Sequence, residues 1–574
     1  MNSLFDRRRD VSGSTSHTAE GFVVFFKKKI HDIRAATADT QPPPTCSQSP
    51  ASLTEFMSCT EDEVRRIIKR SPIKSCTLDP VPTFLLHEFI DLLLPYVTSM
   101  VNASLKQGRF PVSQRHAIIT PRLKKPGLDA ADMANYRPVS NVSFVSKLVE
   151  RVVAVRLHHY LNSNDLLPSC QSAYRKHHSV ETAMLHVWSD IMTATDQRQV
   201  TLLALLDMSS AFDCVDHELL LHRLRITFGI TGTALSWISS FLCDRTYQLA
   251  YGGELSTTHR LQFGVPQGSV LGPLLYILYT VDICRVVESH NLRLHLYADD
   301  CQIYTSVAVG DVTSAVQNLA VCISDINTWT SASRLRFNSS KTEIMWLGAG
   351  HLLQQVDIGE IPVLSSMVKV VQSARDLGVI LDSQLSLCDH IAASCRAGFY
   401  QLRQIRPAIQ SLTPDAAKTI VQAFIACRLD WCNSLLYGVP EVLLRKLQSV
   451  QNAAARLLTG TRRCDHITPV LRRLHWLPVQ RRVKFKIACL VHQSLASTAP
   501  MYLSADIHLA SEHGRQLRSS LYRSLAVPRT RTTFGDRSFT VAGPRLWNSL
   551  PATLRQITNY GQFKRHLKSY LFRA

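Results

Sequence analysis

Hydrophobic and polar positions recur along the chain with two periods, and each period predicts one kind of element. Apolar residues that recur every three or four positions predict helices over residues 84–105, 141–161 and 232–242. Short apolar or alternating runs predict strands over residues 117–123, 200–206, 292–297 and 301–307. Strands and long helices alternate until about residue 350, and the pattern beyond Asp389 is mostly helical. We therefore predict an α/β fold that continues into a helical region.

The first part of the chain has a different composition. Residues 40–52 read TQPPPTCSQSPAS, a Pro-, Ser- and Thr-rich stretch that is typical of a linker. Helical periodicity starts near Thr60, where the sequence TEDE offers an N-cap and an acidic first turn. We therefore expect residues 1–59 to be a linker-like segment. No uncharged apolar run reaches the roughly 18 residues that a membrane span needs, so no membrane partner is expected.

Charge is distributed unevenly over the 574 residues. The chain has 64 Lys and Arg against 44 Asp and Glu, a net charge of +20. From Gln401 onward there are 27 basic and 7 acidic residues, so the whole surplus lies in this last part. Such an asymmetry favours a polyanionic partner, above all nucleic acid, over a basic domain that is merely soluble. The 15 cysteines have no regular spacing, which disfavours a zinc site and favours reduced thiols in the nucleus or cytoplasm.

One predicted helix of the basic region has an amphipathic pattern. In VQRRVKFKIACLVHQSL, Val483, Ile487 and Val491 form an apolar stripe, and four cations crowd the rest of the surface. These cations are Arg481, Arg482, Lys484 and Lys486. We interpret this face as a nucleic-acid-binding surface that contacts phosphates, with a solvated helix face as the alternative.

Three acidic residues stand at the ends of predicted strands. Asp207 ends the apolar run LLALLD, and Asp299 and Asp300 form the tip of the predicted hairpin LHLYADDCQIY. Burying unpaired carboxylates is costly unless a cation compensates their charge. Three carboxylates that converge from neighbouring strands would hold two divalent ions, which is the usual apparatus of nucleotidyl transfer. Mg²⁺ suits such a site because it binds one or two carboxylates together with substrate phosphates.

Around these acids, sequence motifs follow one another in order. They are NYRPVSNVSFVSKLVERV, QSAYRKHHSVETAML, LLDMSSAFDCVDH, FGVPQGSVLGPLLYILYT and YADD, and then NSSKTEIMWLG, DLGVILDSQLS, CRLDWCNSLLYG and GPRLWNSLP. From about Ser75 to the C-terminus, the chain resembles the reverse transcriptase of non-LTR (LINE-type) retrotransposons, most closely chicken-repeat-like and jockey-like elements. Relatives of this kind usually carry an N-terminal endonuclease domain, which we do not expect in this chain.

The resemblance implies a right-hand polymerase fold. Fingers and a palm with a ferredoxin-like sheet would span residues 60–384, a helical thumb residues 385–470, and a basic, mostly helical region residues 471–574. The implied reaction is the RNA-templated addition of dNTPs to a DNA 3′ end by a two-metal mechanism. The implied cofactor is a pair of Mg²⁺ ions, with Mn²⁺ as the alternative, and the implied partners are an RNA template and a DNA primer or target.

The resemblance also assigns roles to the acids and to the residues around them. Asp207 and Asp299 would be the main metal ligands, and Asp300 would complete the triad. Phe212, five residues after Asp207, matches the steric gate, whose ring leaves no room for a 2′-hydroxyl; core packing is the alternative. Asp213 and Asp216 follow at helical positions, where we expect them to be solvated or to cap a helix.

Other implied roles concern the substrate. In GVPQGS, Gln267 and Gly268 would touch the incoming nucleotide and the template, because glycine lets backbone approach a ligand closely; a structural turn is the alternative. Arg137 and Lys125, at the ends of a predicted strand–loop–strand, would clamp the triphosphate. Ordinary surface charge is the competing interpretation for this lysine. Lys341 in NSSKTE corresponds to the lysine that would protonate the leaving pyrophosphate.

Two other functions stay open at this stage. A group II intron-type maturase is disfavoured by the form GVPQGSVLGPLL and by the absence of a maturase-like tail. An inactive, host-retained nucleic-acid-binding protein is disfavoured by the intact carboxylates. Primer extension would distinguish these alternatives from a reverse transcriptase.

Overall fold

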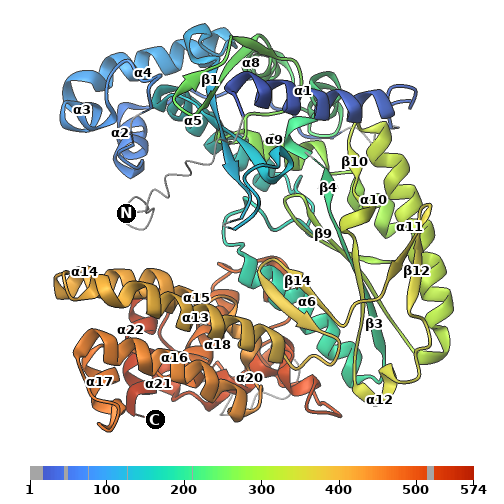
Figure 1. Ribbon diagram of the computed structural model, residues 1–574, viewed down its shortest axis with the longest axis vertical. Coiled ribbons are helices and arrows are strands. Elements are labelled where there is room, and N and C mark those ends of the chain that lie inside the picture. The colour runs from blue at the N-terminus through green and yellow to red at the C-terminus, as the bar shows by residue number, and fades with distance from the viewer. Residues whose placement is uncertain are drawn as a thin grey trace. The chain divides into compact units, whose positions relative to one another are not determined.

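The chain consists of two compact units, each assembled from separate stretches of sequence. The computed structural model describes residues 17–43, 49–74, 76–125, 127–209, 211–512 and 523–573. Within these ranges, unit 1 comprises residues 1–168, 208–286 and 325–338, and unit 2 comprises residues 169–207, 287–324 and 339–574. Both units mix helices with strands, which confirms the predicted α/β class (Figure 1).

Unit 1 is built on a mixed sheet. The order is β2 (Tyr136–Asn141), β1 (His116–Leu123), β5 (Arg245–Tyr251) and β6 (Glu254–Leu255), and β7 (His259–Leu261) also pairs with β5. β1 and β2 are antiparallel, whereas β1 and β5 are parallel. Since side chains alternate along a strand, Tyr136 and Ser140 share one face of the sheet and Arg137 lies on the other. The strand predicted over residues 117–123, and the strand–loop–strand that it begins, are thereby confirmed.

Helices pack on this sheet and on one another. The helix predicted over residues 84–105 is two helices, α3 (Thr83–Glu88) and α4 (Ile90–Gln107), because Phe89 leaves the helical backbone between them. The other helices of unit 1 are α2 (Glu61–Arg70), α5 (Phe144–Ser163), α7 (His217–Ile226), α8 (Gly232–Leu242) and α9 (Gly272–Tyr279). The short strands β4 (Met208–Ser209) and β10 (Arg336–Phe337) form a separate pair.

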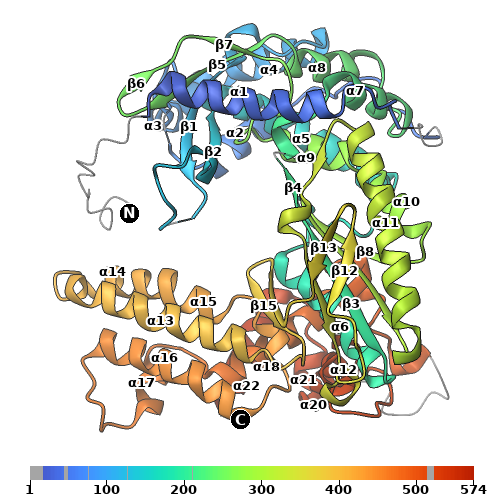
Figure 2. The same cartoon turned by 45° about the vertical axis from the view of Figure 1, so that its right-hand side comes forward.

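The described chain begins with a helix where a linker was expected. α1 (Ala19–Ala36) starts at Thr18, whose side chain accepts a hydrogen bond from the amide of Gly21. Phe22 and Val23 are buried with residues of β1, β2 and β5, and Figure 2 shows the helix lying along this sheet. The prediction of a linker over residues 1–59 is therefore wrong for this stretch. A few apolar residues on one face dock the helix, although lysines follow them directly in the sequence.

Unit 2 contains an antiparallel sheet of four strands. The order is β11 (Glu343–Leu347), β3 (Val200–Leu206), β9 (Asp300–Val307) and β8 (Arg293–Tyr297). β3 is an inner strand that is buried almost throughout, which explains its continuous apolar run. α6 (Val180–Asp196) packs on β3 and β8. Two ribbons follow along the chain, β12–β13 (Glu360–Val363, Ser366–Lys369) and β14–β15 (Ser373–Asp376, Val379–Asp382).

The C-terminal helices share one hydrophobic core with this sheet. Trp188 of α6 and Leu203 of β3 belong to the same buried cluster as Trp547 and Phe563. The helices are α13 (Cys388–Ile409), α14 (Pro414–Val421), α15 (Cys427–Leu429), α16 (Glu441–Thr459), α17 (Ile467–Arg473), α18 (Val479–Leu495), α19 (Met501–Ser504), α20 (Phe539–Ser549), α21 (Ala552–Arg555) and α22 (Tyr560–Arg573). The expected boundaries after residues 384 and 470 do not separate compact units, because these helices and the sheet bury their apolar faces in one core.

Three further helices complete the described chain. α10 (Ile283–Glu288) and α12 (Gly350–Leu353) are short, and α11 (Val312–Ala332) begins in unit 2 and ends in unit 1. α9 ends at Tyr279, and α10 starts at Ile283 after a break. Among the described residues, no helix combines the length and the apolar character that a membrane crossing requires.

Candidate active site

Neighbouring strands of the unit 2 sheet carry two of the predicted carboxylates to the same end. β3 and β9 are antiparallel, and their last paired residues at this end are Leu206 and Cys301. Asp207 comes next on one strand and Asp300 on the other. The side chain of Asp207 is about one-third exposed, and Asp300 is exposed. The strand register thus places two carboxylates side by side where solutes can reach them.

The third carboxylate lies in the tight turn between β8 and β9. Tyr297 pairs with Asp300, which leaves Ala298 and Asp299 as the two residues of the turn. Ala298 has a φ of 61°, in the left-handed region that two-residue hairpin turns use. For a residue with a side chain this conformation costs on the order of 1 kcal/mol, so the surroundings of the turn must hold it.

A lysine from the opposite neighbour of β3 contacts Asp207. Lys341 ends the 3₁₀ turn Ser339–Lys341, which leads into β11, and β11 pairs with β3. Its Nζ donates to Oδ2 of Asp207 at 2.9 Å. The motifs YADD, LLD and NSSK are far apart in the sequence, and the sheet brings them together at one end.

A buried polar pair connects this sheet to the β14–β15 ribbon. Gln302 of β9 donates from Nε2 to Oδ1 of Asp376 in β14 at 2.7 Å, and both residues are buried. Burial raises the pKa of Asp376 to about 7, and the negative charge of Asp300 acts in the same direction. In the described chain, Oε1 of Gln302 and Oδ2 of Asp376 are buried without a hydrogen-bond partner. A proton on Asp376 would therefore supply the donor that this pair lacks.

In unit 1, the GVPQGS segment packs closely against the backbone of two other segments, at Asp213 and at Ser140. A Cβ on Gly264 (φ 82°) would lie 2.6 Å from the carbonyl oxygen of Asp213. A Cβ on Gly268 (φ 128°) would lie 2.2 Å from the carbonyl oxygen of Ser140. The amide of Ser140 also donates to the carbonyl oxygen of Gln267 at 2.7 Å. Both positions therefore require glycine, because the backbone there passes close to the backbone carbonyl groups of Asp213 and Ser140.

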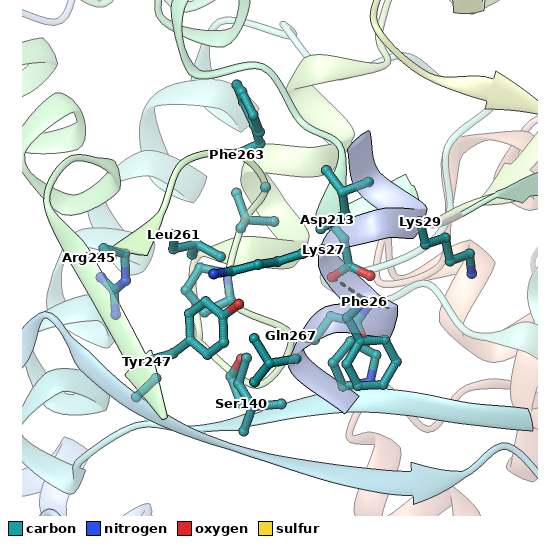
Figure 3. Close-up of a pocket in the computed structure, with 18 of the residues that line it drawn as sticks. Phe26, Lys27, Lys29, Ser140, Asp213, Arg245, Tyr247, Leu261, Phe263 and Gln267 are labelled. Atoms are coloured by element: carbon teal, nitrogen blue, oxygen red, sulfur yellow. Dashed lines mark hydrogen bonds between the residues drawn. The ribbon is translucent and has the colours of Figure 1, made fainter. Parts of the chain in front are cut away.

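Gln267 lines a pocket of unit 1, and this pocket also contains an unusual carboxyl group. Figure 3 shows Gln267 and Asp213 among the residues that line the pocket, together with residues of α1 and β5. Nε2 of Gln267 donates to Oδ1 of Asp213 at 3.4 Å. Burial raises the pKa of Asp213 to about 7, while the charge of Lys29 opposes the shift. Asp213 is half-buried in the wall of this pocket beside α1, so it is less solvated than expected.

Asp216 has the capping role that the sequence predicted. Its Oδ1 accepts a hydrogen bond from the amide of Leu219 at 3.1 Å in the first turn of α7. Its Oδ2 also forms an ion pair with Arg34 of α1 at 2.8 Å. The hydrogen bonds and the charge of Arg34 lower the pKa of this carboxyl group, although desolvation acts in the other direction.

Comparison with known proteins identifies the segment that contains these residues. Residues 123–381 match the family described as reverse transcriptase (RNA-dependent DNA polymerase). This part of the chain is thus similar to a reverse transcriptase domain. This match covers Asp207, Asp299, Asp300 and Lys341 as well as the GVPQGS segment.

Relatives that match more than half of the chain come from non-LTR transposons. The chain is 28% identical over 452 residues to the probable RNA-directed DNA polymerase from transposon X-element of Drosophila melanogaster, covering 78% of the chain and 48% of the relative. It is 27% identical over 410 residues to the corresponding protein of transposon BS, covering 69% and 44%. It is 26% identical over 344 residues to the RNA-directed DNA polymerase from the mobile element jockey, covering 58% and 36%. The jockey-like resemblance is confirmed, and the chain spans less than half the length of these relatives.

The remaining expected residues of the reverse transcriptase domain lie in unit 1. The ring of Phe212 is half-buried and stacks on Tyr276, with centroids 4.5 Å apart. Lys125 and Arg137 are both exposed. Arg137 lies near the start of β2, opposite Arg122, and Lys125 follows the end of β1. Lys124 is engaged within the same loop, because its Nζ donates to the carbonyl oxygen of Ala134 at 2.6 Å. Lys125 and Arg137 are therefore both accessible at the surface.

The donor set of the reverse transcriptase domain suits a hard divalent cation. Asp207, Asp299 and Asp300 supply only carboxylate oxygens, which Mg²⁺ and Mn²⁺ accept as ligands. In the part of the chain that the structure describes, no three His, Cys, Asp or Glu side chains are close enough together to form a metal-binding group. The three carboxylates lie at one end of the sheet but are not gathered into such a group, and Lys341 contacts Asp207 there.

The cationic face expected on α18 is engaged inside the fold. Arg482 forms an ion pair with Asp430, and Nζ of Lys486 lies 2.7 Å from Oε2 of Glu181. Nη1 of Arg481 donates to the carbonyl oxygen of Leu571 at 2.9 Å. Lys484 is half-buried. Three of the four cations thus have partners inside the fold, and phosphate binding by this face stays a prediction.

Sequence reasoning missed two polar residues next to the carboxylates. Asp376 lies in the motif DLGVILDSQLS, but nothing in its sequence context marks it as buried. Gln171 lies in QSAYRK and is 1% exposed. The available signal was Gln302, a polar residue between Cys301 and Ile303 in a predicted strand, which requires a partner when it is buried.

Proposed function

We propose that the chain is an RNA-directed DNA polymerase that adds dNTPs to a DNA 3′ end on an RNA template. The observation that carries the proposal is the register of β3 and β9, which puts Asp207 beside Asp300 and next to the turn that contains Asp299. The match of residues 123–381 to reverse transcriptases supports it. So do the relatives, whose names describe RNA-directed DNA polymerases of transposons.

The proposal assigns the chemistry to the carboxylates and the substrate contacts to other side chains. Asp207, Asp299 and Asp300 would hold two Mg²⁺ ions, with Mn²⁺ as the alternative. When bound, such ions activate an attacking hydroxyl and stabilise a leaving oxygen. Phe212 excludes the 2′-hydroxyl, and Lys125 and Arg137 bind the triphosphate. Gln267 and Gly268 contact nucleotide and template, and Lys341 protonates the leaving pyrophosphate.

The proposal also interprets the architecture as a right hand. The β1–β2 ribbon and the helices of unit 1 correspond to fingers, the sheet of β3, β8, β9 and β11 to a palm, and α13 to α16 to a thumb. α13 supports the last assignment, because exposed cationic and aromatic side chains recur along it every three or four residues, with two adjacent aromatic residues at one of these positions. They are Arg396, Phe399, Tyr400, Arg403 and Arg406. Such a face suits contact with phosphates and bases.

Primer extension by the purified full chain tests the proposal. Wild type should extend oligo(dT) on poly(rA) in Mg²⁺, and Asp299→Asn should retain at most a few per cent of this activity while keeping its melting temperature. Asp311→Asn, an exposed carboxylate elsewhere in unit 2, serves as the matched control and should extend like wild type. A wild-type chain that incorporates no dNTP, or an Asp299→Asn variant as active as wild type, contradicts the proposal.

A further inference from the structure

A short segment of unit 2 extends the carboxylate-bearing sheet beyond its edge strand. Gln171 forms a parallel bridge with Leu296 of β8. The amide of Leu296 donates to the carbonyl oxygen of Cys170 at 2.9 Å, and the amide of Ser172 donates to the carbonyl oxygen of Leu296 at 2.9 Å. Residues 170–173, which we call the support segment, therefore run beside the strand that leads directly into the Ala298–Asp299 turn.

The side chain of Gln171 reaches from the support segment to this turn. Its Oε1 accepts a hydrogen bond from the amide of Ala298 at 3.1 Å and another from the amide of Ala173 at 2.9 Å. Both partners are backbone donors, so the oxygen and not the nitrogen of the side-chain amide must face the turn. Within the described chain, Nε2 of Gln171 is buried without a hydrogen-bond partner. The contact to the turn is thus made entirely by one carbonyl oxygen.

Ala298, the residue that Gln171 contacts, has an unfavourable backbone conformation. Ala298 has a φ of 61°, and a residue with a side chain occupies this region only when its surroundings enforce it. The next two residues are Asp299 and Asp300. A turn that relaxed at Ala298 would move both carboxylates, and misplacing a reacting group by about 1 Å can cost on the order of 100-fold in rate.

We infer that Gln171 is a positioning residue that holds the Ala298–Asp299 turn in the geometry that nucleotidyl transfer needs. This inference rests on the proposed function, since it concerns the carboxylates of that site. Gln171 itself touches no substrate in this assignment. It acts through the backbone amide of Ala298.

A second layer of contacts makes the support segment rigid enough for this task. The hydroxyl of Ser172 lies 3.0 Å from Nε2 of His295 in β8 and 2.9 Å from the hydroxyl of Tyr502 in α19. The hydroxyl of Tyr502 donates in turn to Oγ1 of Thr182 in α6 at 3.2 Å. Gln171, Ser172 and Ala173 are each 1% exposed. Strand, helix and C-terminal region therefore fix the segment that carries Gln171.

Replacement of Gln171 by methionine tests the inference, because methionine keeps the length of the side chain and removes the acceptor. We expect Gln171→Met to lower kcat for primer extension at least tenfold, with the KM for dNTP unchanged within about twofold. Gln451→Met is the matched control. Gln451 is also a buried glutamine of unit 2, 2% exposed, and its Nε2 donates to the carbonyl oxygen of Leu477 at 2.9 Å. This control should keep the wild-type kcat.

A second substitution should rescue the first. Glycine adopts positive φ without strain, so Ala298→Gly removes the need for the anchor. The double variant Gln171→Met/Ala298→Gly should recover at least a third of the lost activity on a logarithmic scale. A purely structural role of Gln171 predicts no such rescue, because Ala298→Gly repairs no packing.

Hydrogen exchange gives a readout that is independent of activity. In Gln171→Met, amides of the peptide covering residues 295–303 should exchange at least tenfold faster than in wild type, while the melting temperature changes by no more than in Gln451→Met. Unchanged exchange in this peptide, an unchanged kcat, or an equal loss in both Gln→Met variants overturns the inference. If wild type fails to extend a primer, the proposed function fails, and the exchange measurement still decides whether Gln171 holds the turn.

Discussion

Nζ of Lys341 lies 2.9 Å from Oδ2 of Asp207. The lysine that precedes β11 therefore neutralises the carboxylate that follows the neighbouring strand β3. The two residues are 134 positions apart in the sequence. Both side chains are partly exposed, which leaves each of them accessible to a substrate and its counter-ions. In the proposed reaction, the same ammonium group is available to donate a proton to the departing pyrophosphate.

Lys341→Ala should lower the single-turnover rate of dNTP addition about 100-fold, which is typical when a general acid is removed. Lys341→Arg retains the charge but donates its protons poorly, so its rate should fall between those of wild type and the alanine variant. Rapid-quench measurements at saturating dNTP give these rates. Lys369→Ala, which removes an exposed lysine of unit 2, is the matched control. A Lys341→Ala rate equal to that of this control would remove Lys341 from the chemistry.

Phe212→Ala and Phe212→Val should raise the efficiency of rNTP incorporation relative to dNTP at least about tenfold. The reason is that the aromatic wall against the 2′-hydroxyl is lost, and steric discrimination of this kind amounts to one or two orders of magnitude. Steady-state incorporation of single rNTPs and dNTPs measures the ratio. If both variants keep the wild-type ratio and melt at a lower temperature, the stacking of Phe212 on Tyr276 is core packing, and another residue is the gate.

Asp376→Asn should make the free energy of unfolding less dependent on pH. Burial raises the pKa of Asp376 to about 7, above its value of about 4 in the unfolded chain, so the protonated form stabilises the fold. This contribution is complete below about pH 4 and is lost as the pH rises through 7. Asparagine offers a permanent donor to Gln302, so the variant should gain stability relative to wild type between pH 5 and pH 8. Urea unfolding at pH 5 and pH 8 measures the free energy of unfolding of both proteins. An equal stability difference between variant and wild type at the two pH values would contradict the prediction.

Arg396, Arg403 and Arg406 should account for part of the salt dependence of RNA binding. Changing all three to Gln should flatten the plot of log K against log salt by about two units, if each contacts one phosphate of a strand or duplex. The three residues are exposed on α13, so the melting temperature should stay at the wild-type value. Filter binding over a salt series measures the slope. Superimposable slopes would mean that this face of α13 is only solvated.

The α18 cations should behave in the opposite way. Changing Arg481, Arg482, Lys484 and Lys486 to Gln removes the ion pairs to Asp430 and Glu181, so the variant should melt at a lower temperature than wild type. Breaking a partly buried pair leaves the partner carboxylate without its counter-charge. Thermal unfolding monitored by circular dichroism checks this. A quadruple variant with the wild-type melting temperature and a flatter salt slope would restore α18 as a phosphate-binding surface.

Local patterns were sufficient to predict the strands that carry the carboxylates. The run LLALL predicted β3, the alternation in RLHLY predicted β8, and YADD predicted the turn between β8 and β9. Periodicity works here because a strand buried on one or both faces has little freedom in its choice of residues. The helix α1 escaped the same reasoning, because only a few of its positions are buried and a run of lysines interrupts the apolar pattern.

The sequence by itself determined the fold class, the reverse transcriptase motifs and the acids at the strand ends, because each of these depends on residues close together in the chain. Only the tertiary structure decided which polar groups meet. It paired Lys341 with Asp207 and Asp376 with Gln302, and it paired two cations of α18, Arg482 and Lys486, with acids of other elements. It also placed Gln171 against the turn at Ala298. A charged or amide side chain has the same identity on a surface and in a buried contact, so its partner depends on which distant segments the hydrophobic core brings beside it.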